Sequence, residues 1–577
     1  MALTSAAGED ELVFLALGGL GEIGMNAYLY GFGPKRERQW LMVDLGITFP
    51  GESEPGVDVV LPDVQFIASE AERQRLAGIV ITHAHEDHIG AVVELWPKLQ
   101  VPVYATPFTV GMLRAKLAQF GGRLAVEIIE VPLGGRFTAG PFDVELVSMA
   151  HSIPETSGLI LRTPAGTALH TSDWKLDPEP VIGPPTDTTK LAALGDEGID
   201  ALICDSTNAL REGVSPSESK VGRSLAEIIK KATDRVAVTT FASNVGRIKA
   251  VAEAARASGR KLVIAGRALH RVIEVGRETG YLPEDMQYLD QQEFKYLDRS
   301  DVVVLLTGSQ GEYRAAMARV AEGEHPDVQL AKGDLVIFSS RNIPGNEKAI
   351  GRIQNKLAEM GCDVLTDTEA LVHVTGHPRR DELKELYGWV RPKVAIPMHG
   401  EARHLREHAR LASAAGVPSV VTPLNGEMVR LAPSPAAVID KVPTGRLFRD
   451  GRLIVPSDEG PVRERRKLSA VGIAVVSVAL SRRGAMIGEA DVAIDGVPFE
   501  TEDGDAMEDV VLDAVDNTLE SIPVARRKDH EMVREAIRRA VRAAIYEEWG
   551  KKPIVKVLLH VIDQAPTPRR PSPGDFE

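Results

Sequence analysis

The sequence has few cysteines and no long apolar run. Cys204 and Cys362, each in or beside an apolar segment, are the only two cysteines in 577 residues. This scarcity excludes a disulfide framework, and their separation excludes a thiolate metal clip, so a reducing compartment is favoured. No segment reaches the roughly 18 apolar residues of a membrane span. Residues 1–12 lack the basic-then-apolar pattern of a signal peptide. We therefore expect a cytoplasmic protein that does not enter membranes.

An excess of positive charge is also absent. The formal net charge is −15, from 67 Lys and Arg against 82 Asp and Glu. Because affinity for phosphates comes largely from Lys and Arg, this charge argues against a nonspecific nucleic-acid coat. It does not exclude a nuclease whose basic groups and metal ions are concentrated in one groove. The chain is also too long for one core, so about three or four structural units are expected.

Residues 80–90 read Val-Ile-Thr-His-Ala-His-Glu-Asp-His-Ile-Gly and carry the densest group of metal-type side chains. An apolar run precedes them and an amphipathic stretch follows, which predicts a buried strand, a polar loop and a helix. His83 and His85 alternate as on a strand end, so both imidazoles can converge on one ion. Asp87 and His88 lie past the turn and can face a second ion. Four such residues in a loop without metal would be rare, so we predict a two-metal site.

More metal-type residues follow predicted strands downstream. His151, Asp173 and His399 each come directly after an apolar segment. An isolated His or Asp at a strand end is more often a turn residue, but residues that could line one sheet edge with the histidine loop reverse that expectation. Nitrogen and oxygen ligands without thiolate suit zinc and tolerate manganese. From the ligands alone the reaction is hydrolysis of either a phosphodiester or an acyl substrate. The expected ligand sets are His83, His85 and His151 for one ion and Asp87, His88 and His399 for the other, with Asp173 bridging both.

Two other motifs are present without their usual context. Gly19, Gly21 and Gly24, with Asp44 about twenty residues on, match a dinucleotide-binding fingerprint. The residues after Gly24 are strand-like and turn-rich where that fingerprint needs a helix, so we expect antiparallel strands with a glycine turn. Residues 404–408 match the zinc-peptidase pattern H-x-x-E-H. On a helix rich in Arg and Ala we interpret this pattern as a solvated face.

The remaining sequence predicts an α/β protein with an inserted domain. From about residue 215, helices alternate with strands that end in Gly, Ser and Asn loops, which is typical of a parallel sheet with an anion-binding edge. The region after residue 463 has no metal-ligand cluster and is interpreted as a dimerisation module. The predicted organisation is a first domain in two parts (1–214 and 374–440), an inserted domain (215–373), a linker (441–462), a C-terminal dimerisation domain (463–564) and a disordered tail (565–577).

Several strings carry a resemblance to known families. His-Ala-His-Glu-Asp-His, with His151 and Asp173 downstream, resembles the metallo-β-lactamase superfamily, whose fold is an αββα sandwich. The inserted domain, with Asp205, His377 and His399 as motifs A, B and C, is similar to the β-CASP group of nucleic-acid nucleases. Six further strings, from about residue 10 to 565, are similar to the bacterial ribonuclease J family. They are Gly-Gly-Leu-Gly-Glu-Ile-Gly-Met-Asn, Cys-Asp-Ser-Thr-Asn-Ala, Phe-Ala-Ser-Asn, Thr-Gly-Ser-Gln-Gly-Glu, Ile-Pro-Gly-Asn-Glu and Met-His-Gly-Glu.

The resemblance implies a ribonuclease with two Zn²⁺ per chain, with Mn²⁺ or Mg²⁺ as alternative supporting ions. It implies a 5′→3′ exonuclease that favours single-stranded 5′-monophosphate ends and also cuts endonucleolytically, in rRNA processing and mRNA decay. Homodimers or homotetramers and RNA-decay partner proteins are implied as well. His377 is implied to stabilise or protonate the departing 3′-oxygen, with Asp87 and Asp205 as further catalytic residues and Asp44 orienting a ligand histidine. The implied RNA-binding residues are Ser243, Asn244, Ser339, Ser340, His373, Val374, Thr375, Gly376 and His377.

The sequence departs from the family pattern at a few positions, and alternatives remain. Thr375 stands where the family often has Ser, Trp174 where Phe is commoner, and Arg341 where a smaller residue is usual. None of these removes a ligand, although Arg341 could alter the 5′-end preference. A scaffold that has lost catalysis is disfavoured by the complete ligand set, and a lactonase or thioesterase by the inserted domain. A DNA-directed β-CASP enzyme is the nearest alternative.

Overall fold

The computed structural model describes residues 10–122, 124–343, 345–458 and 460–562, which fall into two compact units. The larger unit comprises the residues up to 49 together with 59–454, and the smaller unit comprises 50–58 and the residues from 455 onward. The predicted disordered tail, 565–577, lies outside the described residues. Among the described helices, none combines the length and the apolar character that crossing a bilayer requires.

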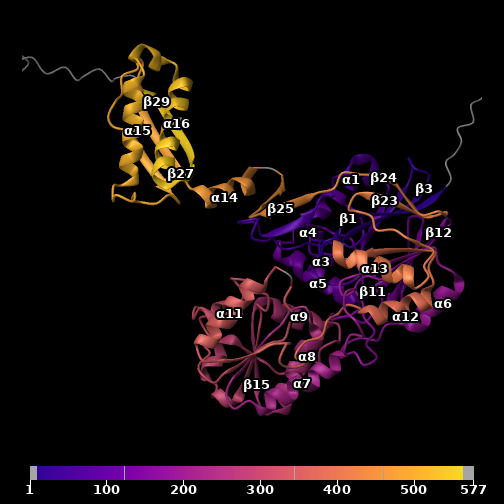
Figure 1. Ribbon diagram of the computed structural model, residues 1–577. Coiled ribbons are helices and arrows are strands. Elements are labelled where there is room, and N and C mark those ends of the chain that lie inside the picture. The colour runs from indigo at the N-terminus through magenta and orange to yellow at the C-terminus, as the bar shows by residue number, and fades with distance from the viewer. Residues whose placement is uncertain (1–9, 123, 344, 459, 563–577) are drawn as a thin grey trace, which may run out of the picture. The chain divides into compact units, whose positions relative to one another are not determined.

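Two β-sheets pack face to face in the larger unit (Figure 1). Phe14 and Tyr30 of one sheet and Phe142 and Ile203 of the other are fully buried in the shared core. The first sheet has the order β24 (Ala437–Lys441), β23 (Glu427–Ala432), β1 (Glu11–Gly18), β3 (Ala27–Gly33), β4 (Gln39–Val43), β6 (Leu76–Val80), β7 (Val103–Ala105) and β8 (Ile128–Glu130). The second has the order β22 (Ser419–Val420), β20 (Val394–Met398), β13 (Ala201–Asp205), β12 (Gly166–His170), β11 (Ser157–Thr163), β10 (Phe142–Ser148) and β9 (Arg136–Ala139).

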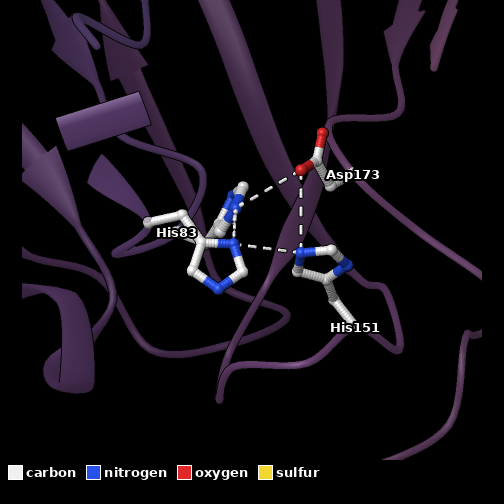
Figure 2. A group of neighbouring side chains, drawn as sticks. His83, His151 and Asp173 are labelled. Atoms are coloured by element: carbon white, nitrogen blue, oxygen red, sulfur yellow. Dashed lines mark hydrogen bonds and ion pairs between the residues drawn. The ribbon is translucent and has the colours of Figure 1, made fainter. Parts of the chain in front are cut away.

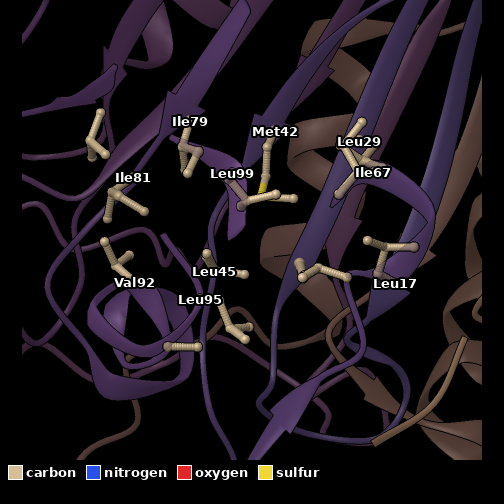
Figure 3. Packing of buried hydrophobic residues seen from close by; sticks show 14 of the residues in the cluster. Leu17, Leu29, Met42, Leu45, Ile67, Ile79, Ile81, Val92, Leu95 and Leu99 are labelled. Atoms are coloured by element: carbon tan, nitrogen blue, oxygen red, sulfur yellow. The ribbon is translucent and has the colours of Figure 1, made fainter. Parts of the chain in front are cut away.

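Helices cover the outer face of each sheet. On the first sheet, Leu29 and Met42 pack with Leu95 and Leu99 of a helix in a second core (Figure 3). Fully burying a Leu or Met side chain contributes about 1.5–3 kcal/mol, so these faces stabilise the layers strongly. The result is the αββα sandwich expected from the sequence. The helices are α1 (Gln65–Ala68), α2 (Glu70–Arg73), α3 (Glu86–Ile89), α4 (Val92–Leu99) and α5 (Pro107–Gln119) on the first side, and α6 (Thr188–Glu197), α12 (Arg380–Val390) and α13 (Ala402–Ala414) on the second.

Helix α13 corrects one expectation. Its H-x-x-E-H pattern was interpreted as a solvated face, but His404 and His408 are buried, at 6% and 0% exposure. They share one side of the helix with Leu405 and Leu411, which are also buried. The buried stripe recurs every three to four residues, as a helix packed on a sheet requires.

A six-stranded sheet forms the inserted domain, and its strands pair in parallel throughout. Apolar cores lie on both of its faces, as a parallel sheet requires. Its order is β16 (Leu289–Asp290), β15 (Lys261–Ala265), β17 (Val302–Leu306), β14 (Val236–Thr239), β18 (Leu335–Phe338) and β19 (Asp363–Leu365). Its helices are α7 (Glu218–Lys231), α8 (Val245–Ala257), α9 (Arg267–Glu278), α10 (Ala316–Ala321) and α11 (Glu347–Glu359), with short 3₁₀ turns at Gln291–Tyr296 and Arg299–Asp301.

The insertion point lies between two neighbouring strands. Strands β13 and β20 pair in parallel, from Ala201 beside Val394 to Asp205 beside Met398. The chain therefore leaves the sandwich after β13, builds the parallel sheet, and returns through α12 to the adjacent strand. The loops after β12, β13 and β20 consequently meet at one edge of the sandwich, where α/β folds place their ligands. The domain limits at 215 and 373 stay predictions.

The smaller unit contains a three-stranded sheet, β28 (Asp491–Asp495), β27 (Ile473–Ser481) and β29 (Ile554–Ile562). Alternate residues of β27 are buried, and Val511 and Ile537 of two helices share their core. The helices of this unit are α14 (Gly460–Val471), α15 (Met507–Ser521) and α16 (His530–Trp549), with a 3₁₀ turn at Val524–Lys528.

The expected linker at 441–462 holds regular structure. It contains β25 (Arg446–Asp450) and β26 (Leu453–Pro456), and β25 pairs with β5 (Val59–Pro62). The two remaining strands are β2 (Leu20–Gly21) and β21 (Gly400–Glu401), which form a short parallel pair.

Candidate metal centre

The buried carboxylate of Asp44 holds the histidine loop from behind. The backbone nitrogen and the hydroxyl of Thr82 donate to its two oxygens at 2.8 and 2.9 Å. His88 Nδ1 lies 2.7 Å from Asp44 Oδ2, so this nitrogen carries a proton and donates to the carboxylate, while Nε2 lies on the opposite side of the ring. This is the contact through which Asp44 was expected to orient a ligand histidine.

The first group of candidate ligands comprises His83, His85, His151 and Asp173, whose ligand atoms all lie within 4.8 Å of one another. His85 Nδ1 lies 3.1 Å from Nε2 of His83 and 3.1 Å from Nε2 of His151. Asp173 Oδ2 is 3.7 Å from His83 Nε2 and 3.6 Å from His151 Nε2. Figure 2 shows the side chains of His83, His151 and Asp173 pointing toward one another from separate segments of the chain.

The second group comprises Asp87, His88, Asp173 and His399. His399 Nε2 is 3.2 Å from Asp87 Oδ2, and His399 Nδ1 is 2.9 Å from Asp173 Oδ1. His88 Nε2 is 3.4 Å from Asp173 Oδ2, the oxygen that also faces the first group. Asp173 is therefore shared, and the two groups have the same members as the two ligand sets expected from the sequence. Their role as metal ligands stays a prediction.

The donor atoms fit a bound cation better than they fit one another. His151 Nδ1 lies 2.7 Å from Gly376 O and must donate to it, so His151 Nε2 carries a lone pair. His85 Nδ1 faces that lone pair and His83 Nε2 as well, yet one ring nitrogen has at most one proton to give. Asp173 is buried between the two groups, with His399 Nδ1 at 2.9 Å from its Oδ1. Converging lone pairs beside a buried carboxylate are the arrangement that a divalent cation stabilises.

The two ligand groups differ in the protonation of their histidines. Burial lowers the pKa of His83 and His151 well below the ordinary value, and it lowers the pKa of His85 to about 4. All three imidazoles are therefore neutral near pH 7, as metal ligation requires. Burial opposes ionisation of Asp87 and Asp173, but the neighbouring histidines hold the pKa of both carboxyls well below the ordinary value. In the second group burial again opposes the charged ring, but Asp173 and its neighbouring carboxylates raise the pKa of His88 and His399 well above the ordinary value, so a cation bound there has to displace protons from these two rings.

Backbone strain is concentrated at this centre. Asp44, Ser172 and His399 have φ values of 62°, 56° and 50°, in the left-handed region that residues with a Cβ rarely adopt. Such conformations cost on the order of 1–3 kcal/mol each and persist only where the surroundings impose them. Each of the three residues follows or adjoins a strand end, so the strain turns side chains out of the sheet and toward the ligand groups.

His377 and Asp205 form a second pair at the edge of the centre. His377 Nδ1 lies 2.7 Å from Asp205 Oδ2, and Asp205 is fully buried at the end of β13. Burial opposes the charge on His377, but Asp205 and Asp173 raise its pKa above the ordinary value. The imidazole therefore favours its charged form more than a free histidine does, and its Nδ1 is held by the carboxylate. These two residues also lie within ligand distance of Asp173 and His399.

The residues expected to bind RNA fall into two sets, of which the first follows strands of the inserted sheet. The hydroxyl of Ser339 is fully buried and donates to Val372 O at 2.8 Å, so a contact between this hydroxyl and RNA would need a rearrangement. Ser340 is buried as well, and Gln310 Nε2 lies 3.4 Å from its hydroxyl. Asn244 begins α8, where its side chain accepts from Arg247 N at 2.9 Å. Ser243 is half-buried beside it.

Residues 373–377 form the second set. Val374 is buried, and Thr375 Oγ1 accepts from Asn208 Nδ2 at 2.8 Å. A Cβ on Gly376 would approach His151 Cε1 to 2.4 Å, so only glycine permits this backbone to contact the ring. The sequence indicated Gly376 only as a phosphate-binding residue, whereas its carbonyl also orients a candidate metal ligand. His373 Nδ1 is buried without a hydrogen-bond partner among the described residues.

Several residues that organise the site were missed. Asn26 Nδ2 lies 3.0 Å from Asp87 O and 3.1 Å from His88 Nε2. Thr82 Oγ1 and Ser172 Oγ lie 3.0 and 3.3 Å from His83 Nδ1. The only available signal was their position next to ligand residues or inside a string shared with a family.

Comparison with known proteins decides the family. Four family models match: a beta-lactamase superfamily domain over residues 54–194, the ribonuclease J beta-CASP domain over 233–357, a Zn-dependent metallo-hydrolase RNA specificity domain over 361–423, and the ribonuclease J C-terminal domain over 460–562. Ribonuclease J of Sinorhizobium meliloti is 54% identical over 551 residues, which is 96% of this chain and 97% of that protein. This chain belongs to the ribonuclease J family.

More distant members of the ribonuclease J family match over most of their length as well. Ribonuclease J of Mycolicibacterium smegmatis is 38% identical over 546 residues, covering 94% of this chain and 95% of the relative. Ribonuclease J of Thermus thermophilus is 37% identical over 478 residues, covering 81% and 82%. The predicted fold class, a metallo-β-lactamase sandwich with an inserted β-CASP domain and a small C-terminal domain, is confirmed. One of the matching models describes a Zn-dependent metallo-hydrolase, and the His and Asp groups could hold a metal ion.

Proposed function

We propose that this protein is a ribonuclease that hydrolyses RNA phosphodiester bonds with two zinc ions. It acts as a 5′→3′ exonuclease that favours 5′-monophosphate ends, and as an endonuclease, in RNA maturation and decay. One observation carries the proposal, namely two ligand groups that share Asp173, beside a His377–Asp205 pair. The matching RNA specificity domain and the ribonuclease J relatives support RNA as the substrate.

The ligand groups divide the work of holding the ions. His83, His85 and His151 would hold one, Asp87, His88 and His399 the other, and Asp173 both. Two such ions activate water and neutralise the charge that develops on a phosphate during in-line displacement. Mn²⁺ or Mg²⁺ in place of zinc is compatible with the oxygen ligands.

His377 is the proposed general acid. Its Nδ1 proton is held by Asp205, which leaves the Nε2 proton for transfer to the departing 3′-oxygen as the P–O bond breaks. Asp205 also keeps the ring charged before the transfer, since it is the main carboxylate that raises the pKa of His377. General acid catalysis of this kind typically contributes about 10²–10⁴-fold.

Two cations, each paired with a carboxylate, lie near the proposed site for the 5′-monophosphate. Burial lowers the pKa of His373 well below the ordinary value, and the Arg247 guanidinium and the Lys175 ammonium lower it further. The same two cations attract an anion placed beside His373, whose Nδ1 is otherwise unpaired. Burying charged groups without partners is costly, so a 5′-triphosphate, which carries two phosphates more, is disfavoured beside the buried His373.

The first experiment asks whether the protein cuts RNA with metal. End-labelled RNA and DNA of one sequence are incubated with the protein, with and without chelator, and with the His88→Ala and Asp87→Ala variants. We expect RNA cleavage by the wild type that is lost with chelator and in both variants, while circular dichroism shows them folded. Glu385→Ala, on the exposed face of α12, is the matched control and should keep full activity. Cleavage by metal-free wild type, or equal cleavage of DNA, would contradict the proposal.

The second experiment asks which 5′ end is preferred. We expect faster digestion of 5′-monophosphorylated than of 5′-triphosphorylated RNA, and a smaller ratio for His373→Ala. Equal rates in the wild type would contradict the proposed 5′-monophosphate site but would not contradict the proposed RNA hydrolysis. The homodimer or homotetramer expected through the C-terminal domain is tested separately by analytical ultracentrifugation of the full chain and of a chain ending at residue 454, which is the end of the larger unit.

A further inference from the structure

The H-x-x-E-H pattern of α13 is the motif that the proposed site does not use. Among the described residues, neither of its histidines belongs to a group that could hold a metal. His404 Nδ1 accepts from the backbone nitrogen of Glu401 at 3.1 Å, within the first turn of the helix. His408 is fully buried one turn later, on the side of α13 that faces the sheet. A peptidase metal site is therefore absent from this helix, and the buried His408 needs another explanation.

His408 bridges two buried hydroxyls. Tyr387 OH lies 2.9 Å from His408 Nε2, and Ser206 Oγ lies 2.8 Å from His408 Nδ1. Burial lowers the pKa of His408 to about 4, so the ring is neutral and has one donor and one acceptor. The hydrogen bonds then run in one direction. Tyr387 donates to Nε2, Nδ1 donates to Ser206, and Ser206 donates to Cys204 O at 3.4 Å. This chain fixes the end of β13 from α12 and α13 together.

The segment fixed in this way carries the partner of the proposed general acid. Ser206 directly follows Asp205, whose Oδ2 holds His377 Nδ1 at 2.7 Å. Thr207 N donates to Asp205 Oδ1 at 2.8 Å, which sets the rotation of the carboxylate. Asn208 Nδ2 lies 3.3 Å from His377 O, so the same short segment contacts the ring and the backbone of His377. A displacement of residues 205–208 would move both contacts at once.

The glutamate of the motif secures the same segment from its other end. Glu407 Oε1 accepts from Arg380 Nη1 at 2.6 Å. That guanidinium nitrogen lies 3.3 Å from Ala209 O, and the backbone nitrogen of Arg380 donates to Arg211 O at 2.9 Å. Two residues of the motif therefore hold residues 206–211 from one helix, with His408 at the buried end.

We propose that His408, supported by Glu407, is a positioning residue that holds Asp205 and thereby aims His377 at the departing 3′-oxygen. This rests on the proposed function, in which His377 protonates that oxygen. His408 itself contacts no candidate metal ligand in the described contacts. The segment it holds reaches His399 through Thr207 Oγ1, which lies 3.1 Å from His399 O and 3.3 Å from its Nδ1. We expect the loss of His408 to act mainly on the transfer of the proton, because its chain ends beside Asp205. A misplacement of about 1 Å costs roughly 10²-fold in rate, so we expect His408→Leu to lower kcat about 10–100-fold with KM within about twofold.

The test compares two leaving groups in the full-length, metal-loaded protein. One substrate is RNA, and the other is the same RNA with sulfur in place of the bridging 3′-oxygen at the cut site. Because a thiolate leaves without being protonated, a variant that has lost only proton transfer cleaves the sulfur substrate almost as fast as the wild type does. His377→Ala, His408→Leu, and the double variant are measured on both, with KM and kcat separated.

We expect both single variants to be impaired on RNA and nearly normal on the sulfur substrate. The double variant should be no slower on RNA than His377→Ala, because both changes remove the same step. Tyr387→Phe should also cleave the sulfur substrate better than RNA, with a smaller ratio between the two rates. His408→Gln keeps a donor and an acceptor, so it should be much faster on RNA than His408→Leu. If His408→Leu does not fold, the ratio of the rates on the sulfur substrate and on RNA is measured for Tyr387→Phe and His408→Gln, and it tests the positioning role in the same way.

Leu411→Ala is the matched control. Leu411 is buried on the same face of α13, so this change destabilises the helix without touching the hydrogen-bonded chain. It should affect both substrates equally. If His377→Ala prefers the sulfur substrate but the His408 and Tyr387 variants lose both activities equally, the positioning role is wrong. If His377→Ala itself shows no preference, the general-acid assignment fails, which is a different result.

Discussion

Replacing Glu382 with alanine is expected to loosen the junction between the sandwich and the inserted domain. Glu382 lies in the first turn of α12 and is fully buried. Its Oε1 accepts from Leu176 N at 2.7 Å, and its Oε2 accepts from Ser215 N and Arg379 N at 2.8 Å each. These three amides come from the segment after Asp173, from the start of the insertion and from its return. One carboxylate therefore ties both crossings of the chain to the loop that carries a candidate metal ligand.

The magnitude follows from what alanine leaves behind. A buried donor without an acceptor costs about 1–3 kcal/mol, and a bond to a charged acceptor contributes about 1.5–3 kcal/mol. Ser215 is buried, whereas Leu176 and Arg379 are half-buried and water can reach them in part. We therefore expect Glu382→Ala to lower the free energy of unfolding by about 3–5 kcal/mol. Glu382→Gln keeps one oxygen and should lower it by about 1–2 kcal/mol.

Urea denaturation followed by circular dichroism measures the loss, with the exposed Glu385→Ala of the same helix as the control. Surface changes of that kind usually fall within about 0.5 kcal/mol. Hydrogen exchange should show the Ser215 amide among the first to lose protection. A Glu382→Ala variant within about 0.5 kcal/mol of the wild type would refute the assignment, as would unchanged protection of that amide.

Three further changes are predicted. Arg247→Leu should lower the free energy of unfolding by about 3–5 kcal/mol, because it leaves the buried Glu218 without its 2.8 Å partner. In the same urea assay, the double variant with Arg247→Leu and Glu218→Leu should recover part of this loss. A double variant that recovers none of it would contradict the pairing. Burial raises the pKa of Asp177, but the Lys175 ammonium at 2.9 Å and hydrogen bonds hold it below the ordinary value. The Asp177 carboxylate thus stabilises the fold at any pH above its pKa in the unfolded chain, about 3.9. This stabilisation is lost as the pH falls through the lower pKa that Asp177 has in the folded protein. Asp177→Asn should accordingly lower the Tm at pH 7, and the gap to the wild type should narrow below about pH 4; a gap that stays constant would count against the sign. Removal of metal by chelator should lower the Tm reversibly, since a ligand at 100–1,000 times its Kd stabilises by about 2.7–4.1 kcal/mol; an unchanged Tm would argue that no metal was bound.

The sequence was sufficient for features that depend on local pattern. The strand, loop and helix around residues 80–90 followed from apolar periodicity, and so did the failure of the glycine fingerprint, because β3 occupies the place of the required helix. The separation of His83 and His85 from Asp87 and His88 followed from their places before and after the turn. These features need only neighbours in the chain, whereas the assignment of His151 and His399 to the two groups concerns distant residues and stays a prediction.

Features that depend on distant partners were not predictable in the same way. Glu382 bonds to Leu176 over 206 positions, and nothing in the residues near either one indicates the contact. His404 and His408 were misjudged for a different reason. The exposed arginines of α13 dominated the interpretation, although Leu405 and Leu411 mark a buried stripe on the same side as the histidines. The strands inside the expected linker at 441–462 were not predicted, because β25 pairs with β5, almost 400 residues earlier.

The insertion between β13 and β20 also sets the timing of biosynthesis. His399 comes 312 positions after Asp87, the residue its Nε2 contacts. At about 5–20 residues per second, a ribosome needs roughly 15–60 s to cross that interval. Strand β1 lacks one of its neighbours for longer still, because Leu12 pairs with Ala432 of β23. Throughout this period the nascent chain holds the histidine loop without its last ligand. In a protein built in this order, the candidate centre cannot be complete before residue 399 of 577 has been translated, so the proposed RNA hydrolysis cannot begin during the first two-thirds of synthesis.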